Sequence, residues 1–62
     1  MIPPDVEMKI QANSKHIKSL AMRIHQLEEM HLAEPANSDY IELQTQQKKL
    51  VDENRQLLAK YN

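Results

Sequence analysis

Three histidines are the residues of this 62-residue chain that could bind a metal ion or exchange a proton near neutral pH. A metal site on a helix needs ligands three or four residues apart, because that spacing places side chains on one face. His16, His25 and His31 are nine and six residues apart, and the nearest match is Glu28 and Glu34 flanking His31 at three-residue spacing. We therefore expect surface histidines beside acidic neighbours, with no metal ion and no cofactor.

Catalysis finds little support in the sequence. An enzyme needs a pocket that excludes water and holds its reacting groups within hydrogen-bond reach. The chain contains no Cys, and no nucleophile–base pair is visible in its 62 residues. We expect no enzymatic activity and no small-molecule substrate. One alternative is a regulatory histidine: His31 falls on the expected helical seam, where its protonation would change how the chain assembles.

Helices must position these side chains, because the composition excludes most other structures. Gly, Phe and Trp are absent, and good helix formers such as Leu, Gln, Glu and Lys dominate. Apolar residues recur every seven positions in two stripes, a period that keeps them on one seam of a helix. The first stripe contains Ile10, Ile17 and Ile24. Each stripe requires an apolar partner surface.

The two stripes predict an all-α, antiparallel two-helix hairpin, with helices at about residues 5–33 and 38–61. Pro35 disfavours helical geometry at the residue before it, and Ser38 or Asp39 can cap the second helix. The hairpin would form one domain over residues 1–62, with a tail at 1–4 and a loop at 34–38. Pairing across this loop places Ile17 beside Asn54 on the seam.

A chain this short without disulfides usually needs oligomerisation or a partner to be stable. We therefore expect two hairpins to pair as a four-helix bundle, in a homodimer or homotetramer. Polar residues also occupy the seam, notably Asn13, Gln47 and Asn54, which could fix the register. The expected helix-packing and oligomer interface contains Ile10, Ile17, Leu20, Ala21, Ile24, Leu27, Leu43, Leu50, Val51, Leu57 and Leu58.

Charge is distributed unevenly along the chain, although the net charge is only −1. Every charged residue between Met8 and Leu27 is basic, and every one from Glu28 to Glu42 is acidic. The hairpin should therefore be acidic at its tip and basic along its body, which favours antiparallel pairing of two copies. Alternatively, this tip contacts a basic partner; its residues are Glu28, Glu29, Glu34, Asp39 and Glu42.

The segments IHQLEEM and SDYIELQTQQKKLVDENRQLL, within residues 24–30 and 38–58, resemble the YdcH-like family of small bacterial proteins. Two departures are the position of His25 and the presence of Val51 where that family has Lys. The resemblance implies a helical hairpin and adds no established activity. The matching positions are Leu27, Glu28, Leu43, Leu50, Asp52 and Glu53.

We interpret the chain as a non-enzymatic protein–protein interaction module that self-associates through its stripes. Two alternatives remain: a chaperone or regulatory subunit whose stripe is completed by a different protein, and a nucleic-acid accessory protein. The small net charge disfavours nucleic acid, and no apolar run approaches the length of about 20 residues that spans a membrane. The absence of Cys and of a signal sequence at the start leads us to expect a cytoplasmic protein.

Overall fold

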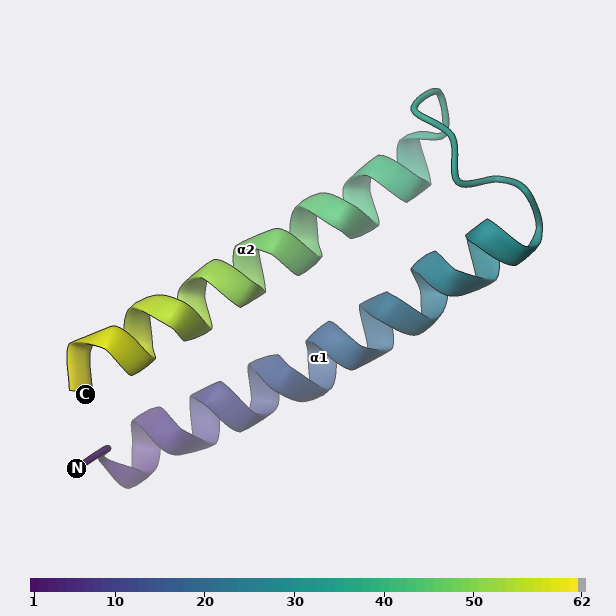
Figure 1. The fold of residues 1–62 in the computed structure, drawn as a ribbon. Coiled ribbons are helices and arrows are strands. Elements are labelled where there is room, and N and C mark those ends of the chain that lie inside the picture. The colour runs from purple at the N-terminus through teal and green to yellow at the C-terminus, as the bar shows by residue number, and fades with distance from the viewer. Residues whose placement is uncertain (62) are drawn as a thin grey trace.

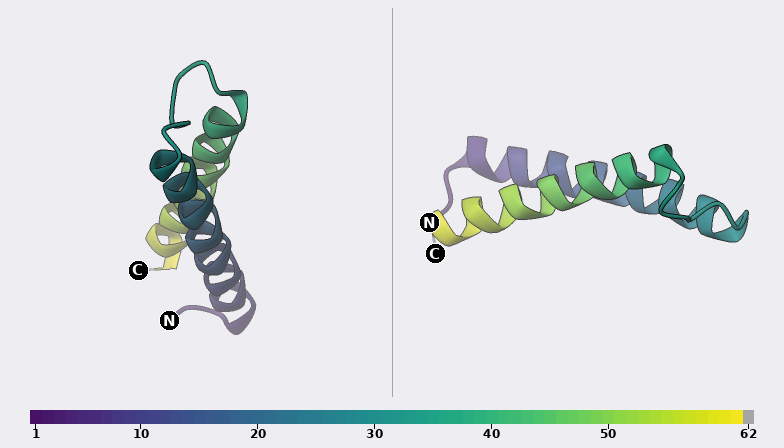
Figure 2. Two further views of the ribbon diagram at one scale, coloured as in Figure 1. Left: turned by 90° about the vertical axis from the view of Figure 1, so that its right-hand side faces the viewer. Right: turned by 90° about the horizontal axis from the view of Figure 1, so that it is seen from above.

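The computed structural model describes residues 1–61 and consists of two antiparallel helices (Figure 1). α1 spans Pro4–Glu29 and α2 spans Ser38–Tyr61, with a loop over residues 30–37. The first and last described residues lie at the same end of the rod, and the loop lies at the other (Figure 2). The rod measures 43 × 16 × 13 Å. The prediction of an all-α hairpin is confirmed.

α1 begins at Pro4, within one residue of the predicted start. Proline suits the first helical turn because its missing N–H would have no partner inside the helix. The Glu7 N–H donates the first hydrogen bond, to the Pro3 carbonyl at 3.0 Å. Asp5 and Glu7 place negative charge near the positive end of the helix dipole.

α1 ends at Glu29, four residues before the predicted end at residue 33, and this part of the prediction is wrong. The chain reverses because His31 adopts a left-handed conformation with φ of 59°. The Leu32 N–H then donates to the Leu27 carbonyl at 2.8 Å, and the His31 N–H donates to the Glu28 carbonyl at 3.1 Å. These two bonds form a Schellman motif, which satisfies the carbonyls that a helix end leaves free.

Asn37 caps α2, in place of the Ser38 or Asp39 that the sequence suggested. Its side-chain Oδ1 accepts hydrogen bonds from the N–H groups of Asp39 at 3.0 Å and Tyr40 at 3.3 Å. Its Nδ2 donates to the Leu32 carbonyl at 2.9 Å, which ties the helix start to the end of the Schellman motif. One side chain therefore joins the start of α2 to Leu32 in the loop. The bounds of α2 agree with the predicted range of 38–61.

The early end of α1 changes which residues face each other. The predicted loop of 34–38 is replaced by one of residues 30–37, so α2 is shifted along α1 by about one turn. Asn54 consequently lies beside Asn13, and not beside Ile17 as predicted; the Asn13 Nδ2 donates to the Asn54 Oδ1 at 3.0 Å. The shift brings two seam amides together.

The contact between the helices buries little. Only Leu20 and Ile24 are buried among the described residues, at 3% and 8% exposure, and the rest of the apolar seam is half-buried. The accessible surface is 5002 Å², whereas a compact monomer of this mass would expose about 4,200 Å². The radius of gyration is 14.0 Å, against about 10.6 Å for a compact chain of this length. A single hairpin is therefore an open structure with a very small core.

The left-handed His31 leads to a test of the loop. Replacing His31 by Gly should stabilise the hairpin by about 1 kcal/mol, because Gly adopts a positive φ without the steric cost of a Cβ atom. Thermal and urea unfolding followed by circular dichroism would measure the change. His31→Ala retains the Cβ and serves as the matched control. Equal unfolding midpoints for the Gly and Ala variants would contradict the left-handed conformation.

Candidate protein–protein interface

A polar cluster crosses the seam near the open end of the hairpin. Beside its bond to Asn54, the Asn13 Nδ2 donates to the Glu53 Oε1 at 3.3 Å. The Asn54 Nδ2 donates to the Ile10 carbonyl at 3.3 Å and to the Ser14 Oγ at 3.4 Å. Seam amides cost stability unless they are paired, and their pairing specifies register. These bonds therefore hold α1 and α2 in one alignment.

An ion pair extends this cluster to the surface. The Lys9 Nζ lies 3.1 Å from the Glu53 Oε1, and the Lys9 hydrogen bond, followed by that from Asn13, lowers the pKa of Glu53 below its usual value. With Ile10 and Ile17 at heptad position a of α1, and Leu50 and Leu57 at position d of α2, Lys9 and Glu53 both occupy position g. Side chains at the two g positions meet on one side of an antiparallel helix pair. The ion pair thus identifies which positions form this flank of the hairpin.

The predicted interface residues fall into three groups by exposure. Leu20 and Ile24 are buried between the helices, and Ala21 and Leu58 are exposed. The remaining members are half-buried on the seam; they are Ile10, Ile17, Leu27, Leu43, Leu50, Val51 and Leu57. Most of the stripe therefore remains accessible to a further apolar surface.

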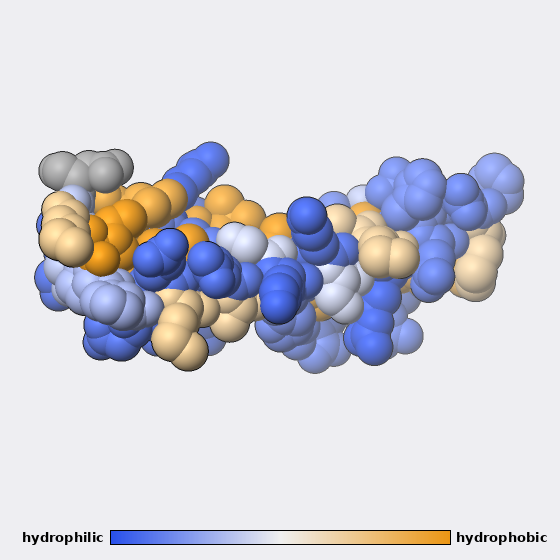
Figure 3. Space-filling view, turned by 90° about the horizontal axis from the view of Figure 1, so that it is seen from below, coloured by the Kyte–Doolittle hydropathy of each residue, from blue (hydrophilic) through white to orange (hydrophobic). Residues whose placement is uncertain are grey.

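The two flanks of the seam differ in character. The flank opposite the Lys9–Glu53 pair, which we term the apolar flank, contains Ala21, Val51 and Leu58 at heptad position e. The charged flank contains Lys9, Glu53 and other ionic side chains. On the face shown in Figure 3, apolar side chains gather toward the end that carries the chain termini, whereas hydrophilic ones dominate near the loop. Glu7 and Glu28 occupy the same position e near the two ends of α1, so the apolar flank is uncharged at this position along the middle of α1 and along α2.

The five carboxylates of the predicted acidic tip are all exposed at the loop end. The Glu29 Oε1 lies 3.0 Å from the His25 Nε2, one helical turn earlier. The Glu42 Oε1 accepts a hydrogen bond from the Gln46 Nε2 at 3.4 Å. Within residues 1–61 Lys9 pairs with Glu53, and no Lys or Arg lies within ion-pair distance of the acidic tip, so most of the tip carries uncompensated charge.

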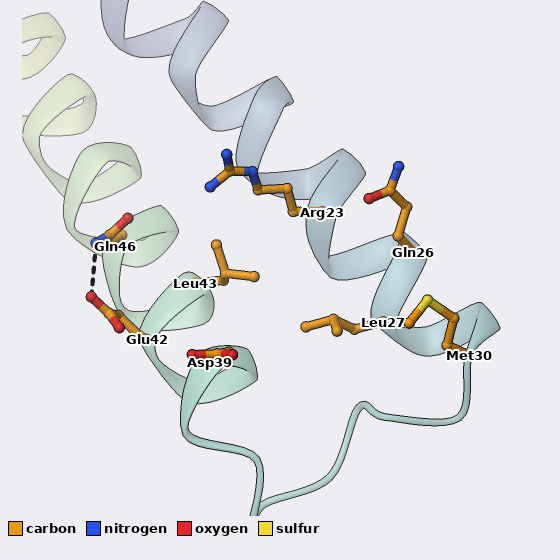
Figure 4. Close-up of a pocket in the computed structure, with 8 residues that line it drawn as sticks. All are labelled: Arg23, Gln26, Leu27, Met30, Asp39, Glu42, Leu43 and Gln46. Carbon is orange, nitrogen blue, oxygen red and sulfur yellow. Dashed lines mark hydrogen bonds between the residues drawn. The ribbon is translucent and has the colours of Figure 1, made fainter.

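An open hollow of about 460 Å³ lies between the helices beside this tip. Leu27 and Leu43 point toward each other from the facing helices, and Met30 lies next to Leu27 (Figure 4). Arg23 extends toward α2 at the body end of the hollow (Figure 4). The rim is completed by polar side chains, namely Gln26, Asp39, Glu42 and Gln46. The hollow thus combines an apolar floor with an ionic rim on the charged flank.

The structure changes the interpretation of the histidines. The three residues Glu28, His31 and Glu34 do not share a helix face, because α1 already ends at Glu29. His31 lies in the loop and not on the seam. No three His, Asp or Glu side chains converge on a common metal position within residues 1–61.

Neither α1 nor α2, as far as the structure describes them, has the length and apolar character that a transmembrane helix requires.

Sequence reasoning did not identify Arg23 or Met30 as members of a common site. Arg23 lies at heptad position g of α1 and Met30 follows seven residues later, just after the helix end, and their partners across the hollow come from α2. That pairing depends on the register of the two helices, and the register predicted from the sequence differs from the observed one by about one helical turn. The g positions of a heptad repeat were the available signal, because they flank the seam in any antiparallel pair.

The amide pair leads to a stability prediction. Replacing both Asn13 and Asn54 by Leu should raise the free energy of unfolding by about 1–2 kcal/mol, because two apolar side chains then pack where amides were. Each single replacement should gain less than half of that, since it leaves the other amide partly unpaired. Urea unfolding of the four proteins in a double-mutant cycle would measure the coupling. Strictly additive changes would show that the two amides do not interact.

The lowered pKa of Glu53 leads to a pH dependence. A carboxyl group whose pKa is lowered on folding contributes stability above the unfolded pKa of about 4.5, and this contribution is lost as pH falls through the folded value. Wild-type protein should therefore unfold at higher temperature than Glu53→Gln at about pH 6, and the difference should shrink toward about pH 3. Thermal unfolding across this range tests it. In a Lys9→Met background the difference should be reduced at every pH.

Comparison of the chain with protein-family models, with curated proteins and with solved structures finds no match. The resemblance to the YdcH-like family consequently rests on the residues quoted above.

Proposed function

We propose that this protein is a non-enzymatic protein–protein interaction module that self-associates through its leucine and isoleucine stripes. The observation that carries the proposal is the open seam: Leu20 and Ile24 alone are buried among the described residues. Nine of the eleven expected interface residues keep exposed apolar surface, and burial of such surface is the main driving force of association. A second copy would supply the missing cover.

The second copy is expected to pack on the apolar flank. Ala21, Val51 and Leu58 extend the seam on that side without a charged residue among them. Two hairpins joined there form a four-helix bundle, in which each helix contacts two neighbours and the half-buried stripe becomes a core. The charged flank is less suitable, because pairing it would desolvate the ions of Lys9 and Glu53.

Charge favours an antiparallel arrangement of the two hairpins. Residues 24–47 contain five acidic residues and no Lys or Arg, whereas the rest of the chain contains all eight Lys and Arg and four acidic residues. An antiparallel dimer places the acidic half of each copy over the basic half of the other. Exposed ion pairs contribute about 0.2–1 kcal/mol each, so they select the orientation while apolar burial drives association.

Light scattering over a hundredfold range of concentration would test the proposal, with mass and helical content measured together. Wild-type protein should have the mass of a dimer or tetramer. Leu58→Glu should give a helical species of reduced mass, because Leu58 is 38% exposed in the hairpin and is buried only by the second copy. The matched control is Met22→Glu, since Met22 is 67% exposed on the outer face of α1 and should tolerate the change.

Leu50→Asp provides a second comparison. Leu50 lies on the seam, so an aspartate there should abolish both folding and association by burying an unpaired charge. A wild-type monomer at every concentration would refute self-association and would favour a stripe completed by a different protein. An unchanged mass for Leu58→Glu would show that the apolar flank is not the dimer interface.

A further inference from the structure

The loop end of the hairpin contains two local arrangements that oppose helix stability. Glu28 and Glu29 occupy the last turn of α1, where the helix dipole is negative and cations are preferred, and that turn contains no basic residue. His31 occupies a left-handed position that Gly adopts at lower cost. Natural proteins tend to retain such local conflicts where a binding site needs them.

The hollow beside these residues has the form of a side-chain binding site. Leu27, Leu43 and Met30 offer apolar surface to this site. Met30 is 60% exposed, and its flexible side chain can adapt to a partner. The volume of about 460 Å³ is within the usual range of binding pockets, although this hollow is open along one side. An apolar side chain of a partner would bury the floor.

The charges around the hollow indicate which residues of the partner should flank that apolar side chain. Asp39 and Glu42 stand on the α2 side of the rim, and neither belongs to the ion pairs found within residues 1–61. The negative end of α1 lies beside them, with Glu28 and Glu29 in its last turn. Within residues 24–47 no Lys or Arg offsets these carboxylates. A cation supplied from outside would therefore be attracted to the loop side of the hollow.

We propose that this hollow docks a basic segment of a partner protein, with an aliphatic side chain on the Leu27–Leu43–Met30 floor and Lys or Arg against Asp39 and Glu42. Arg23 closes the opposite end and orients the segment, because it repels a cation there. The hollow lies on the charged flank, so a second copy packed on the apolar flank leaves it open. That the occupant is a different protein, and not a second copy, rests on the proposed function, in which the second copy packs on the apolar flank.

Fluorescence anisotropy with a labelled helical peptide tests the proposal. The probe contains Leu residues each flanked by Lys, and its control has every Lys replaced by Glu. Only the Lys probe should bind, and Asp39→Asn/Glu42→Gln should weaken that binding about tenfold at low salt. The matched variant Asp5→Asn/Glu7→Gln removes the same two charges from the other end of the hairpin and should change binding less than about twofold.

The apolar floor is tested separately. Met30→Ala should weaken binding of the Lys probe about threefold, from the loss of buried side-chain surface, whereas Met22→Ala on the outer face should have no effect. Equal weakening by both charge variants would overturn the proposal, because it would indicate attraction without a site. Binding of the Glu probe, or no binding of the Lys probe, would overturn it too.

Light scattering on the same samples separates this proposal from self-association. If the hollow binds a different protein, the Lys probe should bind while the mass of the oligomer stays constant, and the Asp39/Glu42 variant should keep that mass. If the probe dissociates the oligomer, the hollow is occupied by a second copy, and the docking proposal fails. A monomeric wild-type chain that still binds the Lys probe would refute self-association while supporting the site.

Discussion

The contact between two helices can cover only one stripe on each of them, and this constraint governs the whole structure. A helix presents its apolar residues over an arc wider than one neighbour can cover. In this hairpin the contact buries Leu20 and Ile24 and leaves the stripe half-exposed from Ile10 to Leu57. Small domains without disulfides or metals commonly resolve such a deficit by association. The open seam is thus a property of the architecture and not of a few unusual residues.

The Schellman motif at the end of α1 determines how the two stripes meet. Its position fixes the loop length, and the loop length fixes the register in which α2 returns along α1. In that register Asn13 and Asn54 bond to each other, Glu53 reaches Lys9, and Leu27 faces Leu43 across the hollow. A helix longer by one turn would place each of these side chains beside a different partner. Local geometry at His31 therefore controls contacts along the full length of the rod.

The sequence predicted the helical hairpin and the members of the seam, because heptad spacing is a local property of each helix. It also predicted the range of α2 and the exposure of the acidic tip. It did not predict where α1 ends, since the chain contains no Gly and a left-handed His gives no distinctive signal. The hollow and the Asn13–Asn54 pair could not be predicted for the same reason: both depend on the register that follows from this helix end.

The two flanks of the seam suit different kinds of contact. Ala21, Val51 and Leu58 offer apolar surface beside the seam, which favours an apolar interface. The exposed cations Lys18, Lys48 and Arg55 lie one turn away from them and would form its border. Around the hollow there are carboxylates, one Arg and a small apolar floor, which favour selective contact with a charged segment. If the hairpin had only one flank suited to binding, self-association and binding of a further partner would compete for the same surface. Because the flanks lie on opposite sides of the seam, a bundle formed on one side leaves the other accessible.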